Sequence, residues 1–470
     1  MKDFRVLDAL LTEYDEAISA EVNIDPLGLL VIWSSYGQNI FQRRISSNSN
    51  DIRNYTLNLF NHAVIRALVE DDSVELGKFL RNEPAYAGRG KDSLAFKQAC
   101  LIYLENVFTY SMIEAQNRQG VETVGVLGVS IARRRWEETK GHPRLAFSHK
   151  ADAHVLKRQN SLGVSGRYKT PLVEMGFFDS VYDYALPESV MQWKLVQAQL
   201  LAKSKPLSGL YRLAREHLGE AVSDSRKVFS CDFSDLPKAL KSGYVSAFRT
   251  PPAVGGYARD FWLSVTRLNE GAAGALYEVL NDEWSSTGQY QTHSSSDVFA
   301  QAVGKPTLRE SDRDLLQHIR LLEPFLSELD LLFEVMLSMK SQQVRDAAAK
   351  WKSLGRDAST LSDLARPIEV NSVMRAQVTD RAGGRLSDLL ALARGASVQH
   401  QMEGLIRYHD TVMKSRGQSS WLRLIRGQQI AVDVRVRQLP TKDERPLGSW
   451  VHHCYLQEFR SLLAGLRGGV

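Results

Sequence analysis

The sequence predicts a mainly α-helical protein of several domains, with a small β-hairpin near the carboxyl terminus. The composition is that of a globular chain, because 43% of the 470 residues are hydrophobic and 24% are charged. Apolar residues recur mostly at helical spacing, and alternation with a period of two is confined to short stretches. The length suggests about three folded cores. A multi-domain helical architecture is therefore expected.

The clearest element near the amino terminus is a helix that ends at about Glu70. Asn50 or Asp51 can cap its first turn, because short polar side chains accept hydrogen bonds from the free amides there. One face carries an apolar stripe that consists of Leu57, Phe60, Val64 and Leu68. A polar stripe beside it consists of Asn54, Asn58, His62 and Arg66.

Two long helices are expected in the middle of the chain. Ser311 and Asp314 have the spacing of a capping box, which predicts a helix that begins there and ends at Glu323. Pro324 is expected to break or kink this helix. A second helix is predicted over Phe325–Leu354, and its methionine-rich apolar face is typical of helix packing.

The carboxyl-terminal part mixes helix and strand. Gly404–Arg416 has helical spacing, whereas Trp421–Arg426 and Ile430–Arg437 are strand-like. These two strands predict a hairpin over 421–437, with one apolar face and one partly cationic face. A final amphipathic helix follows, and its inward face is expected to contain Trp450, Tyr455, Phe459, Leu462, Leu463 and Leu466.

These elements suggest five regions. They are a helical domain at 1–117, a basic region at 118–200, a mixed α region at 201–300, a long helical hairpin at 301–365, and a basic helical domain at 366–470 that contains the β-hairpin. The stretch 285–296 is rich in Ser, Thr and Gln and is expected to be a linker.

A cytoplasmic location without a membrane span is expected. The most apolar stretch, Pro26–Gln42, contains Ser, Gly, Gln and Asn and falls short of the ~20 apolar residues that a membrane span needs. Met1–Arg5 has mixed charge and no apolar core follows it, so no signal peptide is expected. Cys100, Cys231 and Cys454 are far apart and odd in number, which favours a reducing compartment without disulfides.

The positive charge is concentrated in two blocks. Residues 118–169 contain 11 basic and 4 acidic side chains, and residues 366–470 contain 16 and 9. Such blocks are typical of proteins that bind a phosphate backbone, because each cation near a phosphate releases a counterion. A solvated face without a partner is the alternative.

Residues 150–178 resemble a helix-turn-helix unit of the winged-helix type. Lys150–Leu162 would be the first helix and Gly163–Ser165 the turn. Pro171 is tolerated only in the first turn of a helix, so the second helix would begin near Thr170.

The resemblance implies that the second helix enters the major groove of DNA with its amino end first. It would present Ser165, Arg167, Tyr168 and Lys169 to bases and phosphates. Other cations of the block would hold the flanking backbone, namely Arg133, Arg134, Arg135, Lys140, Arg144, Lys157 and Arg158. A second cationic surface is expected on the carboxyl-terminal hairpin, formed by Arg423, Arg426, Arg435 and Arg437. The segment 181–184 would be a short wing, and winged-helix units also serve as protein-interaction modules.

The sequence contains no convincing catalytic signature. Gly88–Ser93 lacks the first glycine and the adjacent hydroxyl of a phosphate-binding loop. The cysteines stand alone, and the adjacent residues His452 and His453 would point in different directions on a helix, so no metal and no cofactor are expected. The spacing of a HEPN-type ribonuclease motif occurs about as often as chance allows, at Arg144/His149, Arg212/His217, Arg313/His318 and Arg394/His400.

The function expected from these patterns is that of a non-catalytic subunit that binds nucleic acid, with duplex DNA as the expected form. The subunit would belong to a bacterial multi-protein machine, such as an anti-phage defence system, in which an ATPase or nuclease partner supplies the chemistry. A structural bridging subunit whose winged helix binds protein is the first alternative. A HEPN-like ribonuclease is the second.

Overall fold

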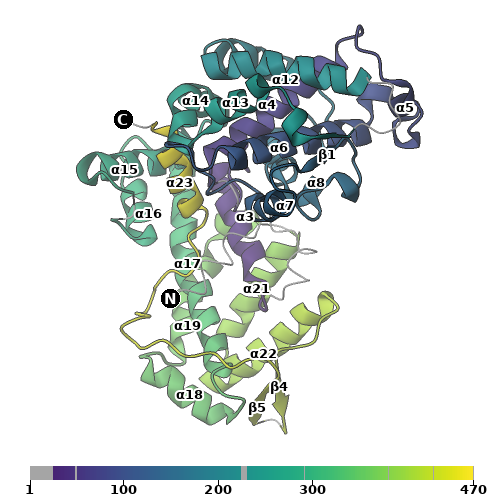
Figure 1. Ribbon diagram of the computed structural model, residues 1–470. Coiled ribbons are helices and arrows are strands. Elements are labelled where there is room, and N and C mark those ends of the chain that lie inside the picture. The colour runs from purple at the N-terminus through teal and green to yellow at the C-terminus, as the bar shows by residue number, and fades with distance from the viewer. Residues whose placement is uncertain are drawn as a thin grey trace. The chain divides into compact units, whose positions relative to one another are not determined.

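The protein is mainly helical, as predicted, and two small antiparallel sheets accompany the helices (Figure 1). The computed structural model describes residues 25–47, 50–223, 230–290, 292–378, 380–426 and 428–468. The predictions for Met1–Arg5 and for the hairpin turn at Gly427 lie outside these residues. Within the described ranges, no helix is long and apolar enough to cross a membrane.

The chain forms two compact units, and each combines segments that are distant in the sequence. Unit 1 consists of 25–42 and Leu268–Gln457, and unit 2 consists of Arg43–Arg267 and the residues from Glu458 onward. The segment 285–296 joins two consecutive helices inside unit 1.

Unit 2 is a helical body with one two-stranded sheet. Its helices are α4 (Ile52–Val69), α5 (Lys78–Arg81), α6 (Leu94–Glu114), α7 (Val129–Glu138), α8 (Gln159–Leu162), α9 (Val164–Arg167), α10 (Lys169–Glu174), α11 (Ser189–Leu195), α12 (Lys205–Ser223), α13 (Lys238–Phe248), α14 (Pro251–Thr266) and most of α23 (Leu456–Leu466). Its strands β1 (Arg144–Ala146) and β2 (Ser230–Asp232) pair antiparallel.

The core of unit 2 surrounds α4, which packs against α6, α12 and α14. The predicted helix is confirmed, with Asp51 as its amino-terminal cap. Both stripes of α4 are largely buried, because neighbours cover the polar face as well. Asn54 donates hydrogen bonds to the carbonyl of Gly125 and to the hydroxyl of Tyr168.

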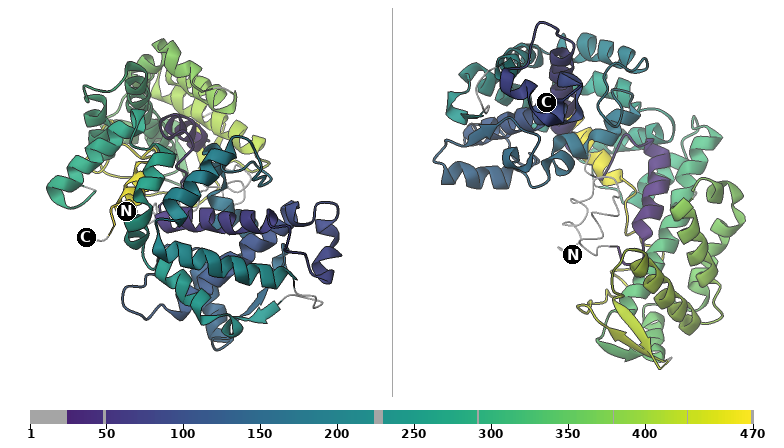
Figure 2. Two further views of the ribbon diagram at one scale, coloured as in Figure 1. Left: turned by 90° about the horizontal axis from the view of Figure 1, so that it is seen from above. Right: turned by 90° about the vertical axis from the view of Figure 1, so that its right-hand side faces the viewer.

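Unit 1 contains the long helix α17, which is visible at its centre in Figures 1 and 2. Its helices are α3 (Leu29–Phe41), α15 (Gly271–Thr287), α16 (Ser295–Val303), α17 (Glu310–Met336), α18 (Val344–Ser353), α19 (Ser359–Val370), α20 (Ser372–Ala376), α21 (Asp380–Ala393) and α22 (Val398–Ser415). Its strands are β3 (Ser341–Gln343), β4 (Leu422–Ile425) and β5 (Gln429–Val432), in the order β3-β5-β4.

The helix does not break at Pro324, so the predicted end at Glu323 is wrong, because α17 continues through this residue. The alternative prediction, a kink at Pro324, stays a prediction. A proline in a helix interior costs about 3 kcal/mol. The turns that follow offset this cost, since Phe325, Leu326 and Leu329 are completely buried. The predicted capping box at Ser311 is also wrong. The box forms instead at Ser294 and Asp297, where it begins α16.

The predicted helix over Phe325–Leu354 is interrupted by strand β3. Gln342 explains where α17 ends, because its side-chain amide donates hydrogen bonds to the last carbonyls of the helix, those of Val335 and Met336. Ser341 then pairs with Ala431 of β5. The predicted hairpin is confirmed as β4 and β5, but its second strand ends at Val432 rather than Arg437.

Asp51 is expected to be essential for the stability of unit 2. Its carboxylate caps α4 and contacts the buried guanidinium of Arg53 at 2.6 Å. The Asp51→Ala variant loses the cap and leaves a buried charge unpaired, so the free energy of unfolding should fall by about 3 kcal/mol or more. Urea unfolding followed by circular dichroism measures this loss.

The control is Ser93→Ala, which removes the cap of α6 without breaking an ion pair. It should cost only about 1 kcal/mol. Equal losses in the two variants would show that the ion pair between Asp51 and Arg53 contributes nothing.

Candidate nucleic-acid interface

Helix α7 carries the first cations of the predicted interface, and it directs only some of them to the surface. Arg133 donates hydrogen bonds to Gln116 and Thr123, and Arg135 donates one to the carbonyl of His154 at 2.7 Å. Arg134 is exposed and lies 3.8 Å from Glu138, a distance at which an exposed ion pair contributes little. Two of the three consecutive arginines therefore hold the fold together.

The helix predicted over Lys150–Leu162 does not form. The segment contains one short turn of 3-10 helix at Ala151–Ala153 and then α8, and Arg158 between them has a left-handed backbone with a φ of 57°. The side chain of Gln159 explains the interruption. It accepts hydrogen bonds from the amides of Val155 and Leu156, which a continuous helix would have used internally.

The second predicted helix is divided into α9 and α10, and Pro171 lies in the first turn of α10. No strand forms at 181–184, where Tyr182 and Tyr184 are buried. The resemblance to a winged-helix unit is therefore not confirmed.

The residues predicted to contact bases are mostly inside unit 2. Ser165 and Tyr168 are buried, and the ring of Tyr168 packs edge-on against Tyr55. These two side chains cannot reach a DNA groove, so their assignment to the interface is corrected.

The two cations of this predicted helix are half-buried. The ammonium of Lys169 donates a hydrogen bond to the carbonyl of Ser180 and lies 4.6 Å from the centre of the Tyr182 ring. Burial lowers the pKa of both Lys169 and Arg167. Both positions therefore contribute to packing.

Two polar residues of α6 hold this segment, and the sequence analysis did not identify them. The amide of Val164 donates to the Glu105 carboxylate at 3.0 Å, and burial raises the pKa of Glu105 to about 7. Asn106 donates to the carbonyl of Ala153 and accepts from Gln159. The available signal was their position in the mostly apolar stretch from Cys100 to Ile113.

Five of the cations predicted to hold the flanking backbone are exposed, namely Arg134, Lys140, Arg144, Lys157 and Arg158. Several of them lie on segments that contact each other. The bond from Arg135 to His154 joins α7 to the loop 154–158, and Leu156 lies against Gly128 at the beginning of α7. Arg144 is on strand β1 and donates a hydrogen bond to the hydroxyl of Ser230.

The predicted cations of the carboxyl-terminal hairpin belong to unit 1. Arg423 forms an ion pair with Asp433 at 2.7 Å, and Arg437 lies 3.3 Å from Glu334 and 5.7 Å from the centre of the Trp421 ring. Arg426 and Arg435 are exposed. Two of the four arginines thus already have acidic partners within the chain.

The Arg–His pairs do not share a common arrangement. His217 lies 2.8 Å from the hydroxyl of Tyr103, and His318 lies 2.9 Å from the side-chain oxygen of Gln377. Arg394 follows α21, whereas His400 is in α22. Burial lowers the pKa of His217.

Comparisons with known proteins identify no relative of this chain. No protein-family model, curated protein or solved structure matches the chain significantly, so functional proposals depend on the residues described above.

Proposed function

We propose that unit 2 binds the phosphate backbone of nucleic acid through the exposed cations on α7, on the turn that follows it, on β1 and on the loop 154–158. The supporting observation is that the cations of residues 118–169 fall into two groups, one that binds to other parts of unit 2 and one that is exposed. Arg133, Arg135 and Lys169 make internal hydrogen bonds, whereas Lys140 and Lys157 are exposed. Exposed cations on neighbouring segments suit a line of phosphates.

The proposed contact is to phosphates rather than to bases. Contacts to phosphate position a protein on nucleic acid, and contacts to base edges provide sequence specificity. Since Ser165 and Tyr168 are buried, they offer no means of distinguishing base sequences. Duplex DNA remains the proposed ligand, because its charge density gives a stronger electrostatic attraction than a single strand does.

We further propose that the protein acts as a non-catalytic subunit, with an ATPase or nuclease partner, in a bacterial machine such as an anti-phage defence system. The non-catalytic part of this proposal agrees with the Arg–His pairs, which do not share a common arrangement.

The affinity for duplex DNA should depend strongly on salt. If five cations each contact a phosphate, log affinity should fall linearly with log salt with a slope of about −4.5. Fluorescence anisotropy with a labelled duplex at several salt concentrations measures the slope. Single-stranded DNA and duplex RNA are measured alongside. A slope near zero for all three would contradict backbone binding.

The double variant Lys140→Glu, Lys157→Glu should weaken DNA binding about 10-fold or more and should lower the magnitude of the salt slope by about two. The matched control is Lys203→Glu, Lys205→Glu, which makes the same chemical change at two exposed lysines of unit 2 outside the basic block. The control should bind nearly as well as the wild type. Equal losses in the two double variants would indicate that only net charge matters, and the proposed interface would then be wrong.

A further inference from the structure

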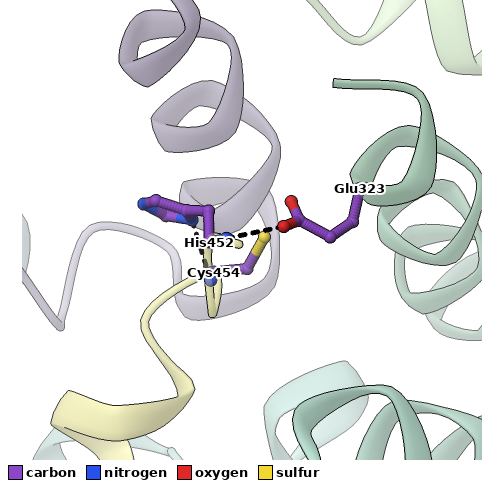
Figure 3. A group of neighbouring side chains, drawn as sticks. All are labelled: Glu323, His452 and Cys454. Atoms are coloured by element: carbon purple, nitrogen blue, oxygen red, sulfur yellow. Dashed lines mark hydrogen bonds between the residues drawn. The ribbon is translucent and has the colours of Figure 1, made fainter. Parts of the chain in front are cut away.

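Three possible metal ligands come together inside unit 1, although the spacing of cysteines and histidines in the sequence predicts no metal site. The carboxylate of Glu323, the imidazole of His452 and the thiol of Cys454 each have a ligand atom within 4.8 Å of the others (Figure 3). Glu323 is in the middle of α17, and the other two residues are in the irregular segment before α23. Glu323 and Cys454 are completely buried.

The buried carboxylate of Glu323 differs from three other buried acids of unit 1, each of which lies close to an arginine. Asp25 lies close to Arg416, Glu328 to Arg356, and Glu334 to Arg437. Among the residues that the structure describes, no cation forms an ion pair with Glu323. Burying a carboxylate without a compensating positive charge costs free energy. Glu323 lacks the cationic partner that Asp25, Glu328 and Glu334 each have.

One oxygen of Glu323 is fully used, and the other is not. Oε1 accepts hydrogen bonds from the amides of Val451 and His452, at 2.8 and 2.6 Å. Oε2 is buried and has no hydrogen-bond partner. The indole nitrogen of Trp33 lies close enough to this carboxyl group to lower its pKa, although neither this nitrogen nor Oε2 has a partner in hydrogen-bond geometry. The unpartnered Oε2 is a second observation that points to a missing ligand at this position, and it is separate from the proximity of the three ligand atoms.

We propose that Glu323, His452 and Cys454 bind a zinc ion. Zinc accepts one oxygen, one nitrogen and one sulfur ligand readily, whereas magnesium and calcium select oxygen ligands. The ion would supply the positive charge that Glu323 lacks and would satisfy Oε2. Three protein ligands leave a fourth position for water or another small ligand.

Zinc binding requires a local adjustment of the turn. Figure 3 shows the thiol of Cys454 on the side that faces Glu323 and the ring of His452 on the other side. Nδ1 of His452 accepts a hydrogen bond from the Cys454 amide at 2.9 Å, and the ring stacks on Trp33. Ligands around a tetrahedral zinc ion lie about 3.3–3.8 Å apart. On binding zinc, the ring of His452 would exchange its hydrogen bond to the Cys454 amide for the metal.

The full-length protein is tested for metal by removing bound ions with a chelator, adding zinc, dialysing it and measuring the zinc content. About one equivalent of zinc per chain is expected to remain. Cobalt is then used as a probe, since thiolate coordination gives a charge-transfer absorption in the near ultraviolet. This measurement on the wild type needs no variant, and the absence of both zinc and the absorption band would overturn the proposal.

Two matched pairs of variants locate the site. Cys454→Ser should lose the cobalt band and weaken zinc binding about 10-fold or more, whereas Cys100→Ser, at an equally buried cysteine of α6, should change neither. His452→Ala should weaken zinc binding, and His453→Ala should not. Equal binding by the two members of either pair would show that any zinc is held elsewhere and would refute the proposed site.

Discussion

The fold depends on side chains of buried helices that satisfy the backbone groups of irregular segments. In unit 2, Arg53 of α4 donates to the carbonyls of Glu122 and Val124, and Glu105 of α6 accepts from the amide of Val164. In unit 1, Glu323 of α17 accepts two amides in the same way. A buried backbone group without a partner costs about 1–3 kcal/mol. The long irregular segments are therefore stable only because polar residues occupy positions inside the core.

This constraint also determines which charges reach the surface. Arg135 and Lys169 are basic residues of the block 118–169, yet each uses its charge to bind a carbonyl of the same unit. Lys140 and Lys157 have the same kind of side chain and remain exposed. The net charge of a segment thus overestimates the charge that a ligand meets. The proposed interface is therefore defined by which cations are exposed, and not by which residues lie within the basic block of the sequence.

The elements that could be predicted from the sequence are those whose signals are local. Helix α4 has its cap and its periodic apolar residues within one stretch, and the hairpin β4–β5 has alternation on both sides of a short turn. The segment 150–178 was mispredicted because its conformation depends on Glu105 and Asn106, which are distant in the sequence. Strand β3 was missed for the same reason, since its partner β5 follows it by many residues. The candidate zinc ligands were invisible because Glu323 and Cys454 become neighbours only in the folded chain.

The division of the chain has a consequence for its synthesis. Helix α3 emerges from the ribosome early, but its partners α15, α17 and α21 in unit 1 are made only after all of Arg43–Arg267. Domains tend to fold as they emerge, and closing a long loop delays contacts between its ends. Unit 2 can thus become largely structured while Trp33, Tyr36 and Phe41, which are buried in the finished protein, still lack their partners. Nascent chains of this protein should therefore present α3 to molecular chaperones until the segments that form α15, α17 and α21 have been made.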